Sequence, residues 1–537
     1  MTVSAAGSER VYVGQQAGLS ASIPSTWTFD RTGTFDYAGA DGFIQSDTLP
    51  QQTLLDACTF LGSDYAVEAG PLNASWSGKP ACTLDVQTSA GPGRVLVVPM
   101  PKPITMYGAS LHFAFVLADN AHFDAVVSSL SFDPSRVSAE AFVASVIDLV
   151  EARAWWSDRV DWATLRPSML ARAKDLPNLA SSQTVVRQLI DALRLGGDNH
   201  SFLISPRQAS ALGQIYGFGM QVADGWIVSV YPDGPAARAG IQVGDHILTA
   251  NGLPPQDTYG FDPVFRWGPA ATFVLERTGQ PASLTVRIVA GQYSGYQPVV
   301  AALVGPQPLG YLAIPAFGTP GREREFVERA NDQVGIIDRR GACGWIIDLR
   351  LNGGGDYRPM ISALGPILGN GTFVGWEFPD GETHWVSYQD GVIRDNGEVA
   401  SEFVPADGFH ALSAPLPPVA VLLGPGTASS GEVTALAFVG RPNTLSFGLS
   451  TGGWTTANAT FRLFDGSNLG LAVAAMVDRS GQTHLDGIAP DQVVPGSWST
   501  FGTDQDPVIQ VASDWLMRQP GCAGATGTPE PSPAPRP

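Results

Sequence analysis

The chain of 537 residues is predicted to be a multidomain α+β protein with an α/β core. Its length exceeds the 50 to 250 residues of a typical domain, so three or four units are expected. The composition is 44% apolar with 61 Gly and 42 Pro, which suits folded domains with many turns. The spacing of apolar residues changes along the chain from strand-like alternation to a helical period, and then to strand–helix–strand order.

The charge and composition exclude several classes of partner. A formal charge of −19 would repel a phosphate backbone, so nucleic-acid binding is not expected. No stretch reaches 18 uninterrupted apolar residues, so no transmembrane segment is predicted. The chain has neither a CxxC nor an HExxH pattern, and we therefore expect no metal and no cofactor.

Four cysteines allow two disulfides. Cys58 and Cys82 lie 24 residues apart in the N-terminal part, and Cys343 with Cys522 would tie the C-terminal segment to the core. Four buried free thiols are the alternative, because spacing does not establish disulfide geometry. Residues 1–9 lack the basic and apolar regions of a signal peptide. The cysteine pairs, the scarce lysines and the Pro-rich tail favour an extracytoplasmic or secreted protein whose signal peptide was removed; a cytoplasmic protein is the alternative.

The first two segments carry different periodicities. Residues 1–135 alternate apolar and polar positions, with one helix-like run at Leu54–Leu61, and predict an α+β accessory domain. From Ser138, a plausible N-cap, the period becomes helical up to about Leu195. We therefore predict a helical segment at 136–205.

The next segment, 206–292, contains YGFGMQVADGWIVSVYPDGPAARAGIQVGDHILTANG, which predicts a short strand, a hairpin, a one-turn helix at Pro235–Ala239 and a further strand. This stretch resembles a PDZ domain. The resemblance implies that backbone N–H groups of one loop hold a peptide carboxylate while the peptide adds a strand to the sheet edge. An ordinary β-hairpin with a Gly-rich turn is the alternative. The loop implied is Tyr216, Gly217, Phe218 and Gly219.

Residues 293–518 form the predicted α/β core. The segment IIDLRLNGGGD, 346–356, is a buried strand that runs into three glycines, which permit close backbone approach to a ligand. A second strand, Val419–Leu423, runs into GPGTASSGEVTALAF, with a helix starting at Gly431. A serine at such a strand-to-helix turn exposes its hydroxyl near helix N–H groups, as an acyl-transfer nucleophile requires; a serine N-cap is the alternative. The tail at 519–537 is expected to be disordered.

Together these motifs resemble the carboxyl-terminal processing peptidases, or tail-specific proteases, and among them the histidine-using, tricorn-like branch. The resemblance covers residues 140–500 and includes, in order, the helical segment, the PDZ segment, GYLAIPAF, DLRLNGGG, TASSGE and GIAPD. It implies a crotonase-like catalytic core, preceded or interrupted by the PDZ domain. It also implies a serine endopeptidase that cleaves polypeptides recognised by their free C-termini.

The resemblance places the nucleophile at Ser429, three residues before Glu432, which is expected to be structural. The oxyanion hole would use the backbone N–H groups of Ser430 and Gly354, with Gly353 as the neighbouring choice.

Many members of the family activate the serine with a lysine about 25 residues downstream, where this chain has Trp454. No lysine follows Lys174, so a Ser–Lys dyad within the core is excluded. The tricorn-like branch uses a histidine in a D-x-H-[ST] motif before the PDZ segment, and this chain reads GGDNHSFL there. His200 is therefore the implied base, because a neutral imidazole can take the serine proton at pH 7. A helix-terminal histidine packed against the core is the alternative.

The orienting residue departs from the family pattern. The branch places a glutamate just before its terminal G-[IV]-x-P-D segment, where this chain has His484, with Asp486 two residues later. Asp486 is the implied third catalytic residue. Two other interpretations remain: a catalytically inactive, PDZ-bearing scaffold, and an esterase, although the Gly-x-Ser-x-Gly turn of an esterase is missing.

Overall fold

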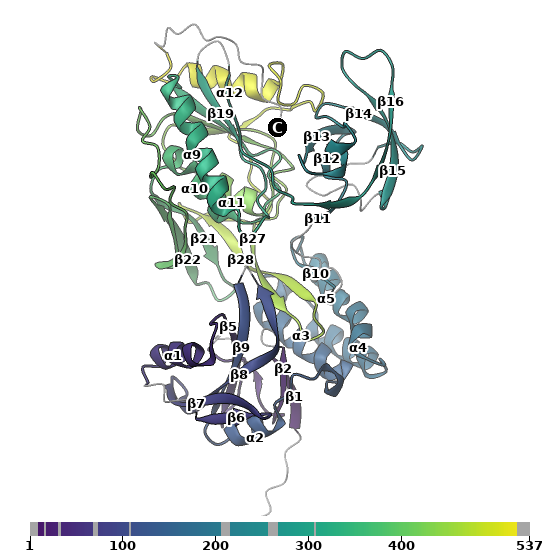
Figure 1. The fold of residues 1–537 in the computed structure, drawn as a ribbon, viewed down its shortest axis with the longest axis vertical. Coiled ribbons are helices and arrows are strands. Elements are labelled where there is room, and N and C mark those ends of the chain that lie inside the picture. Colours follow the sequence, from purple (N-terminus) through teal and green to yellow (C-terminus); the bar gives the residue numbers. More distant parts are fainter. Residues whose placement is uncertain are drawn as a thin grey trace, which may run out of the picture. The chain divides into compact units, whose positions relative to one another are not determined.

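The computed structural model describes residues 9–14, 18–30, 34–67, 73–106, 109–205, 215–255, 267–304 and 308–523. These residues divide into two compact units (Figure 1). The first comprises Met1–Ser210 with Asn458–Val473, and the second Ala211–Ala457 with Ala474–Pro537. The finer division into five segments stays a prediction. The first residues of the predicted disordered tail, 519–523, form turns instead, because Cys522 is buried in its disulfide with Cys343, and 524–537 lie outside the described residues.

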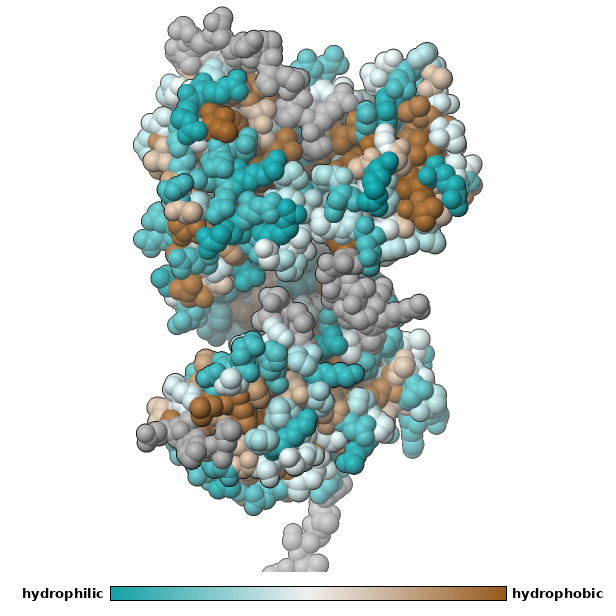
Figure 2. All heavy atoms as spheres, in the orientation of Figure 1, coloured by the Kyte–Doolittle hydropathy of each residue, from teal (hydrophilic) through white to brown (hydrophobic). Residues whose placement is uncertain are grey.

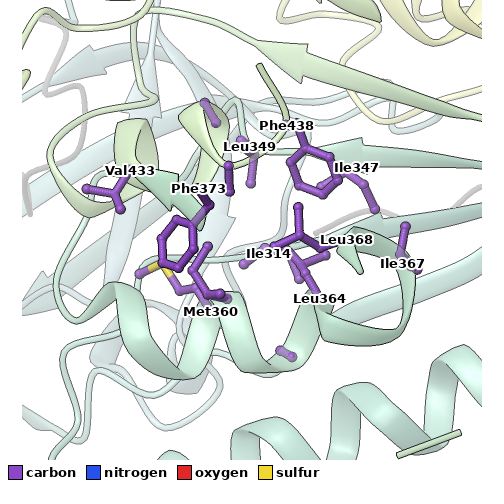
Figure 3. Close-up of a cluster of buried hydrophobic side chains, with 14 of the residues drawn as sticks. Ile314, Ile347, Leu349, Met360, Leu364, Ile367, Leu368, Phe373, Val433 and Phe438 are labelled. Carbon is purple, nitrogen blue, oxygen red and sulfur yellow. The ribbon is translucent and has the colours of Figure 1, made fainter. Parts of the chain in front are cut away.

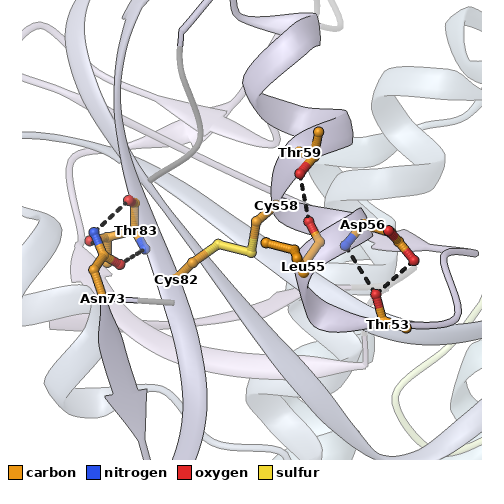
Figure 4. Close-up of a disulfide and its surroundings, with 8 residues drawn as sticks. All are labelled: Thr53, Leu55, Asp56, Cys58, Thr59, Asn73, Cys82 and Thr83. Carbon is orange, nitrogen blue, oxygen red and sulfur yellow. Dashed lines mark hydrogen bonds between the residues drawn. A yellow bond between two sulfur atoms is a disulfide. The ribbon is translucent and has the colours of Figure 1, made fainter. Parts of the chain in front are cut away.

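The first unit contains an antiparallel sheet that is covered on both faces. Helix α1 (Leu54–Asp64) packs on one face, where Cys58 forms a disulfide with Cys82 (Figure 4). Helix α2 (Phe123–Ser129) and the hairpin of β1 (Glu9–Gly14) and β2 (Leu19–Pro24) pack on the other. The predicted α+β fold is confirmed here. The sheet order is β3 (Thr28–Phe29), β4 (Tyr37–Ala38), β5 (Phe43–Leu49), β9 (Ala109–Asp119), β8 (Gly91–Met106), β7 (Lys79–Thr88) and β6 (Ala74–Trp76).

The predicted helical segment is also present, and Ser138 caps it as expected, since its Oγ accepts a hydrogen bond from the N–H of Ala141. After the last helix, strand β10 (Phe202–Ile204) pairs with Asn468–Gly470. The return of 458–473 to this unit was not predicted. The helices are α3 (Ala139–Arg153), α4 (Trp162–Lys174) and α5 (Gln183–Leu195), with 3-10 turns at Pro134–Arg136, Ser157–Arg159 and Leu179–Ser182.

The second unit begins with the predicted PDZ-like part, a five-stranded antiparallel sheet with α7 (Pro235–Arg238). Gly219, at φ +71°, lies so close to the backbone of Gly234 that a Cβ would come within 2.7 Å of its Cα, which is why this loop needs a glycine. The sheet order is β12 (Met220–Ala223), β13 (Trp226–Val230), β14 (His246–Ala250), β15 (Ala270–Glu276) and β16 (Leu284–Val289); β11 (Ile215–Gly217) pairs with β17 (Gly291–Tyr293).

The rest of this unit has the predicted α/β architecture. Helices α9 (Glu323–Arg339), α10 (Tyr357–Leu368) and α11 (Ser430–Leu436) pack on one face of the sheet around the apolar cluster of Figure 3. Helix α12 (Pro507–Met517) packs on the other face, and the Cys343–Cys522 disulfide links its end to the start of β20. The order is β18 (Val300–Val304), β19 (Leu309–Ala313), β20 (Gly344–Asp348), β25 (Val419–Leu423), β26 (Thr444–Gly448) and β30 (Gln492–Val493), parallel from β19 onward.

A second antiparallel sheet in this unit was not predicted. It contains β21 (Gly371–Glu377), β22 (Thr383–Gln389), β23 (Val392–Asp395) and β24 (Glu398–Glu402), and β21 pairs with the second half of β28 (Asn468–Asp478). Strands β27 (Thr456–Arg462) and β29 (Thr483–His484) also pair with β28.

The surface mixes polar and apolar side chains (Figure 2). Exposed large apolar residues include Leu55 and Phe60 on α1, and Leu253 and Val289 in the PDZ-like part. In the part of the chain that the structure describes, no helix combines the length and hydropathy needed to cross a membrane.

Candidate active site

Ser429 occupies a strained turn between β25 and α11. Its backbone has φ 54° and ψ −122°, a conformation that costs an ordinary residue about 1–3 kcal/mol and is concentrated at functional sites. The helix begins at Ser430, one residue before the predicted Gly431. The serine is partly exposed and stands at the N-terminus of α11.

The turn at Ser429 is hydrogen-bonded to the end of the IIDLRLNGGGD segment, whose residues 352–355 form the glycine loop. The N–H of Ala428 donates to the carbonyl oxygen of Asn352 at 2.9 Å, and Thr427 Oγ1 donates to the carbonyl oxygen of Leu349 at 2.8 Å. A Cβ on Gly431 would lie 2.1 Å from the carbonyl oxygen of Asn352, so only glycine fits there. These contacts explain why the motif is built from small residues.

The predicted oxyanion-hole residues lie beside the serine. Gly354 has φ +110°, and a Cβ added to it would lie 2.8 Å from Ser429 Cβ and 3.1 Å from the nitrogen of Ser430. The N–H of Gly354 donates to Asn352 Oδ1 at 3.1 Å, whereas among the described residues the N–H groups of Gly353 and Ser430 have no partner. This difference favours Gly353, the neighbouring choice, as the second donor.

Ser430, the other serine of the motif, has its side chain engaged elsewhere. Its Oγ donates to the carbonyl oxygen of Gly355 at 2.5 Å. That bond holds the glycine loop against the helix. Ser429, and not Ser430, is the serine of the motif with the strained backbone.

Glu432 is completely buried and connects the turn to a second loop. Its Oε2 accepts from the N–H of Ser429 at 2.9 Å, and its Oε1 accepts from Thr451 Oγ1 at 2.5 Å and from the N–H of Gly453 at 2.9 Å. Burial raises the pKa of Glu432, although these hydrogen bonds oppose the rise. The contacts give this glutamate a structural role.

The loop that carries Asp486 is fastened to the same network. The N–H of Ile488 donates to Thr451 Oγ1 at 2.8 Å, and a Cβ on Gly453 would lie 3.5 Å from the backbone of Asp486. The carboxylate of Asp486 is exposed and, within the described ranges, makes no hydrogen bond or ion pair. Trp454 is half-buried in the adjoining loop.

Arg350, between the strand and the glycines, was not considered from the sequence. Its buried guanidinium donates to Asp348 at 2.6 Å and to Asp506 at 2.8 Å and lies over the ring of Phe501. Burial opposes its charge, but the two carboxylates hold the pKa of Arg350 above its ordinary value. An arginine neutralised in this way secures the end of β20 rather than binding an anionic substrate.

His200 belongs to the first unit, in the turn between α5 and β10. Asp198 Oδ1 accepts from the N–H groups of His200 and Ser201, both at 2.8 Å, and its Oδ2 accepts from Ser201 Oγ at 2.5 Å. These bonds explain the D-x-H-[ST] spacing. From the returning segment, Asn458 Nδ2 donates to the carbonyl oxygen of His200 at 2.9 Å. Since Ser429 belongs to the second unit, the pairing of His200 with Ser429 stays a prediction.

Five other histidines lie against neighbouring side chains. His484 Nε2 is 3.0 Å from Asp478 Oδ2, which makes it unavailable as a substitute for the missing glutamate. His246 stacks on Trp226, with ring centroids 4.5 Å apart. The rings of His122, His384 and His410 lie within 2.9, 3.3 and 2.8 Å of carboxylate oxygens of Asp119, Glu382 and Asp338, respectively.

Comparisons with known proteins agree with the motifs. Residues 308–494 match the model of peptidase family S41, and residues 226–260 match a PDZ domain. The chain is 35% identical over 181 residues to the nisin-resistance protein of Lactococcus lactis subsp. lactis, covering 34% of this chain and about half (54%) of that protein. It is 25% identical over 387 residues to the chloroplastic C-terminal processing peptidase of Tetradesmus obliquus, covering 64% of this chain and 76% of the relative.

Among solved structures, the photosystem II D1 C-terminal processing protease aligns with a TM-score of 0.45 and 22% identity, over 70% of this chain and 97% of that one. The two family models together cover the glycine and serine motifs and residues 226–260 of the PDZ-like part. The chain therefore carries a peptidase domain of family S41 together with a PDZ domain, and it is similar to the carboxyl-terminal processing proteases, which are serine-type peptidases.

Proposed function

We propose that this protein is an endopeptidase in which Ser429 attacks the peptide bond and His200 is the general base, acting on polypeptides captured by their C-termini. The observation that carries the proposal is the strained, partly exposed Ser429 at the N-terminus of α11, with Gly354 against its Cβ. The neighbouring loops hold the backbone of Ser429 in an unfavourable conformation. Strained conformations of this kind are concentrated at functional sites.

In the proposed reaction, the imidazole of His200 takes the proton of Ser429 Oγ as the oxygen attacks the scissile carbonyl carbon. The carbonyl oxygen becomes an oxyanion that accepts hydrogen bonds from the N–H of Ser430 and of Gly353 or Gly354. The protonated histidine then donates its proton to the leaving amine, and an acyl-enzyme forms. Water, deprotonated by the same imidazole, hydrolyses that ester and restores the serine.

Asp486 is proposed as the third catalytic residue. Its unpaired, exposed carboxylate is available to stabilise the imidazolium of His200. The network from Glu432 through Thr451 to Ile488 fixes the loop that carries it relative to the nucleophile turn.

The PDZ-like part supports capture of substrate C-termini. Of the four predicted loop residues, Tyr216 and Gly217 belong to strand β11, and Phe218 and Gly219 lead from it into β12. Strand β12 is an edge strand of its sheet, where a peptide can add. We propose that the loop holds the terminal carboxylate. Peptides with free and amidated C-termini separate this proposal from general peptide binding: equal cleavage of the two would contradict it.

Two disulfides support a location outside the cytoplasm, where such bonds persist. We therefore propose an extracytoplasmic or secreted protein.

Fluorophosphonate labelling tests the enzymatic proposal. The wild-type protein should be labelled at Ser429 and should cleave an unfolded protein, whereas Ser429→Ala should do neither. A wild-type protein that binds peptides but resists labelling would instead be an inactive scaffold.

A further inference from the structure

Asn352, the residue before the three glycines, is completely buried and joins the two motifs of the candidate site. Its Oδ1 accepts a hydrogen bond from the N–H of Gly354 at 3.1 Å, which closes a turn within the glycine loop. Its main-chain carbonyl oxygen accepts from the N–H of Ala428 at 2.9 Å, directly before Ser429. One residue therefore fixes both the glycine loop and the serine turn.

The turn decides which N–H groups remain for an oxyanion. Asn352 occupies the N–H of Gly354. Within the ranges that the structure describes, the N–H groups of Gly353 and Ser430 have no partner. A Cβ placed on Gly354 would lie 3.1 Å from the nitrogen of Ser430, so the glycine loop and the start of α11 are in close contact. The spacing of the two remaining donors hence depends on how Asn352 holds this loop.

The carboxamide of Asn352 is held in the orientation that this turn needs. Its Nδ2 donates to the sulfur of Met360, which lies on α10 and is labelled in Figure 3, at 3.3 Å. Thr434 Oγ1, on α11, lies 3.5 Å from the same sulfur. A reversed carboxamide would set its NH₂ group against the N–H of Gly354, donor against donor. The thioether accepts but does not donate, and it therefore favours the observed orientation.

A neutral amide suits this position better than a carboxylate. Oxyanion stabilisation depends on donors aimed at the charge that develops in the transition state. A carboxylate at residue 352 would also accept from Gly354, but it would add a buried negative charge near that oxyanion, and both desolvation and repulsion oppose this. An alanine would leave the loop without its acceptor.

We propose that Asn352 is a positioning residue for the oxyanion hole: by holding Gly354, it aims the N–H of Gly353, with that of Ser430, at the carbonyl oxygen of the scissile bond. Met360 supports this role because it fixes the carboxamide. The inference rests on the proposed attack by Ser429 and adds to it, since Asn352 acts through the backbone that it holds.

The test compares Asn352→Ala, Asn352→Ser and Met360→Leu with wild type in the full chain, by peptide kinetics and by inhibition with a peptide aldehyde. The aldehyde adds to Ser429 Oγ, and the oxygen of the hemiacetal occupies the oxyanion hole as in the transition state. Active sites are counted by the endpoint of fluorophosphonate labelling. Ser362→Ala is the matched control, because Ser362 is buried on the same helix as Met360 and its Oγ has no hydrogen-bond partner in the described part of the chain.

Asn352→Ala should lower kcat per labelled site by about tenfold or more with KM unchanged, because the donors act on the transition state rather than on the bound substrate. The inhibition constant of the aldehyde should rise by the same factor. Asn352→Ser should lie between Asn352→Ala and wild type, since a serine hydroxyl accepts the same N–H more weakly. Met360→Leu, which keeps a similar volume, should lower kcat and aldehyde affinity together by about twofold to fivefold. Ser362→Ala should match wild type in both.

A purely structural role would lower the thermal midpoint or the number of labelled sites, with kcat per site and aldehyde affinity unchanged. That outcome in Asn352→Ala, or equal losses in Asn352→Ala and Asn352→Ser, would overturn the inference while the wild-type protein remained labelled and active. If neither Asn352 variant folds, wild-type kcat and aldehyde affinity in Met360→Leu would overturn it. A wild-type protein that is not labelled would instead refute the proposed nucleophile.

Discussion

The serine turn and the histidine turn are built by different means. Ser429 has a strained backbone, set by glycines that admit close approach and by a fully buried Glu432. His200 has no positive φ, and its turn is held by the side chains of Asp198 and Asn458. The first arrangement depends on close glycine contacts in addition to hydrogen bonds, and the second on side-chain hydrogen bonds. Changes in shape should therefore damage the serine site most, and changes in hydrogen bonding should damage the histidine site most.

The largest effect is expected from Ser429→Ala. Removing the nucleophile should reduce cleavage of an unfolded protein by several orders of magnitude. Ser430→Ala is the control, since its Oγ bonds the carbonyl oxygen of Gly355 and its backbone N–H is retained. Because it loses that bond to the glycine loop but keeps the nucleophile, it should lose far less activity than Ser429→Ala. If Ser430→Ala abolished cleavage and Ser429→Ala did not, the assignment would move by one residue.

Gly354→Ala tests the role of shape. The added Cβ would meet Ser429 Cβ at 2.8 Å with φ at +110°, so the glycine loop must withdraw from the serine. Loss of an oxyanion-hole donor costs about 10²–10³ in kcat, and we expect a fall of that size in peptide cleavage. Gly318→Ala, where a Cβ meets no atom within 4 Å, should be close to wild type. Similar rates for the two variants would show that close approach at Gly354 is unimportant.

Glu432→Gln tests the buried link between the loops through pH. Because burial raises the pKa of Glu432 above 4.5, the folded state holds the proton more tightly than the unfolded chain. Its contribution to stability is full below about pH 4.5 and declines as pH rises through the raised pKa. The thermal midpoint of wild type relative to Glu432→Gln should therefore fall from pH 4.5 upward. Glu398→Gln, an exposed change, should give parallel curves; parallel curves for Glu432→Gln would contradict the buried role.

The disulfides should affect stability with little effect on catalysis. Thiol titration under denaturing, non-reducing conditions should find no free thiol. Replacing Cys343 and Cys522 with serine should cost more stability than replacing Cys58 and Cys82, since the loops closed are 179 and 24 residues. Four free thiols would remove the support for an extracytoplasmic location. An equal loss of stability in the two double variants would contradict the expectation that the longer closed loop contributes more.

The sequence predicted local structure better than long-range structure. Strand β25, the glycine loop and the Ser138 cap could be predicted, because apolar runs and capping residues act over a few positions. The β21–β24 sheet and the return of 458–473 were missed, because they depend on pairing between distant segments.

The same limit applied at the candidate site. Motif spacing singled out Ser429 and His200, but the roles of Asn352 and Asn458 rest on contacts across tens to hundreds of residues. The Asn-Gly-Gly-Gly run is the one local pattern that includes Asn352, and no local pattern indicates the contact that Asn458 makes.

The pH dependence of Ser429 labelling, measured for wild type and His200→Ala, tests the central claim most directly. A serine hydroxyl needs a base, and no lysine follows Lys174. The wild-type rate should rise between about pH 5 and 8, where an imidazole loses its proton. His200→Ala should be slower by several orders of magnitude, while His484→Ala, whose ring is paired with Asp478, should change little. A flat wild-type profile, or a larger loss in His484→Ala than in His200→Ala, would contradict the Ser–His mechanism.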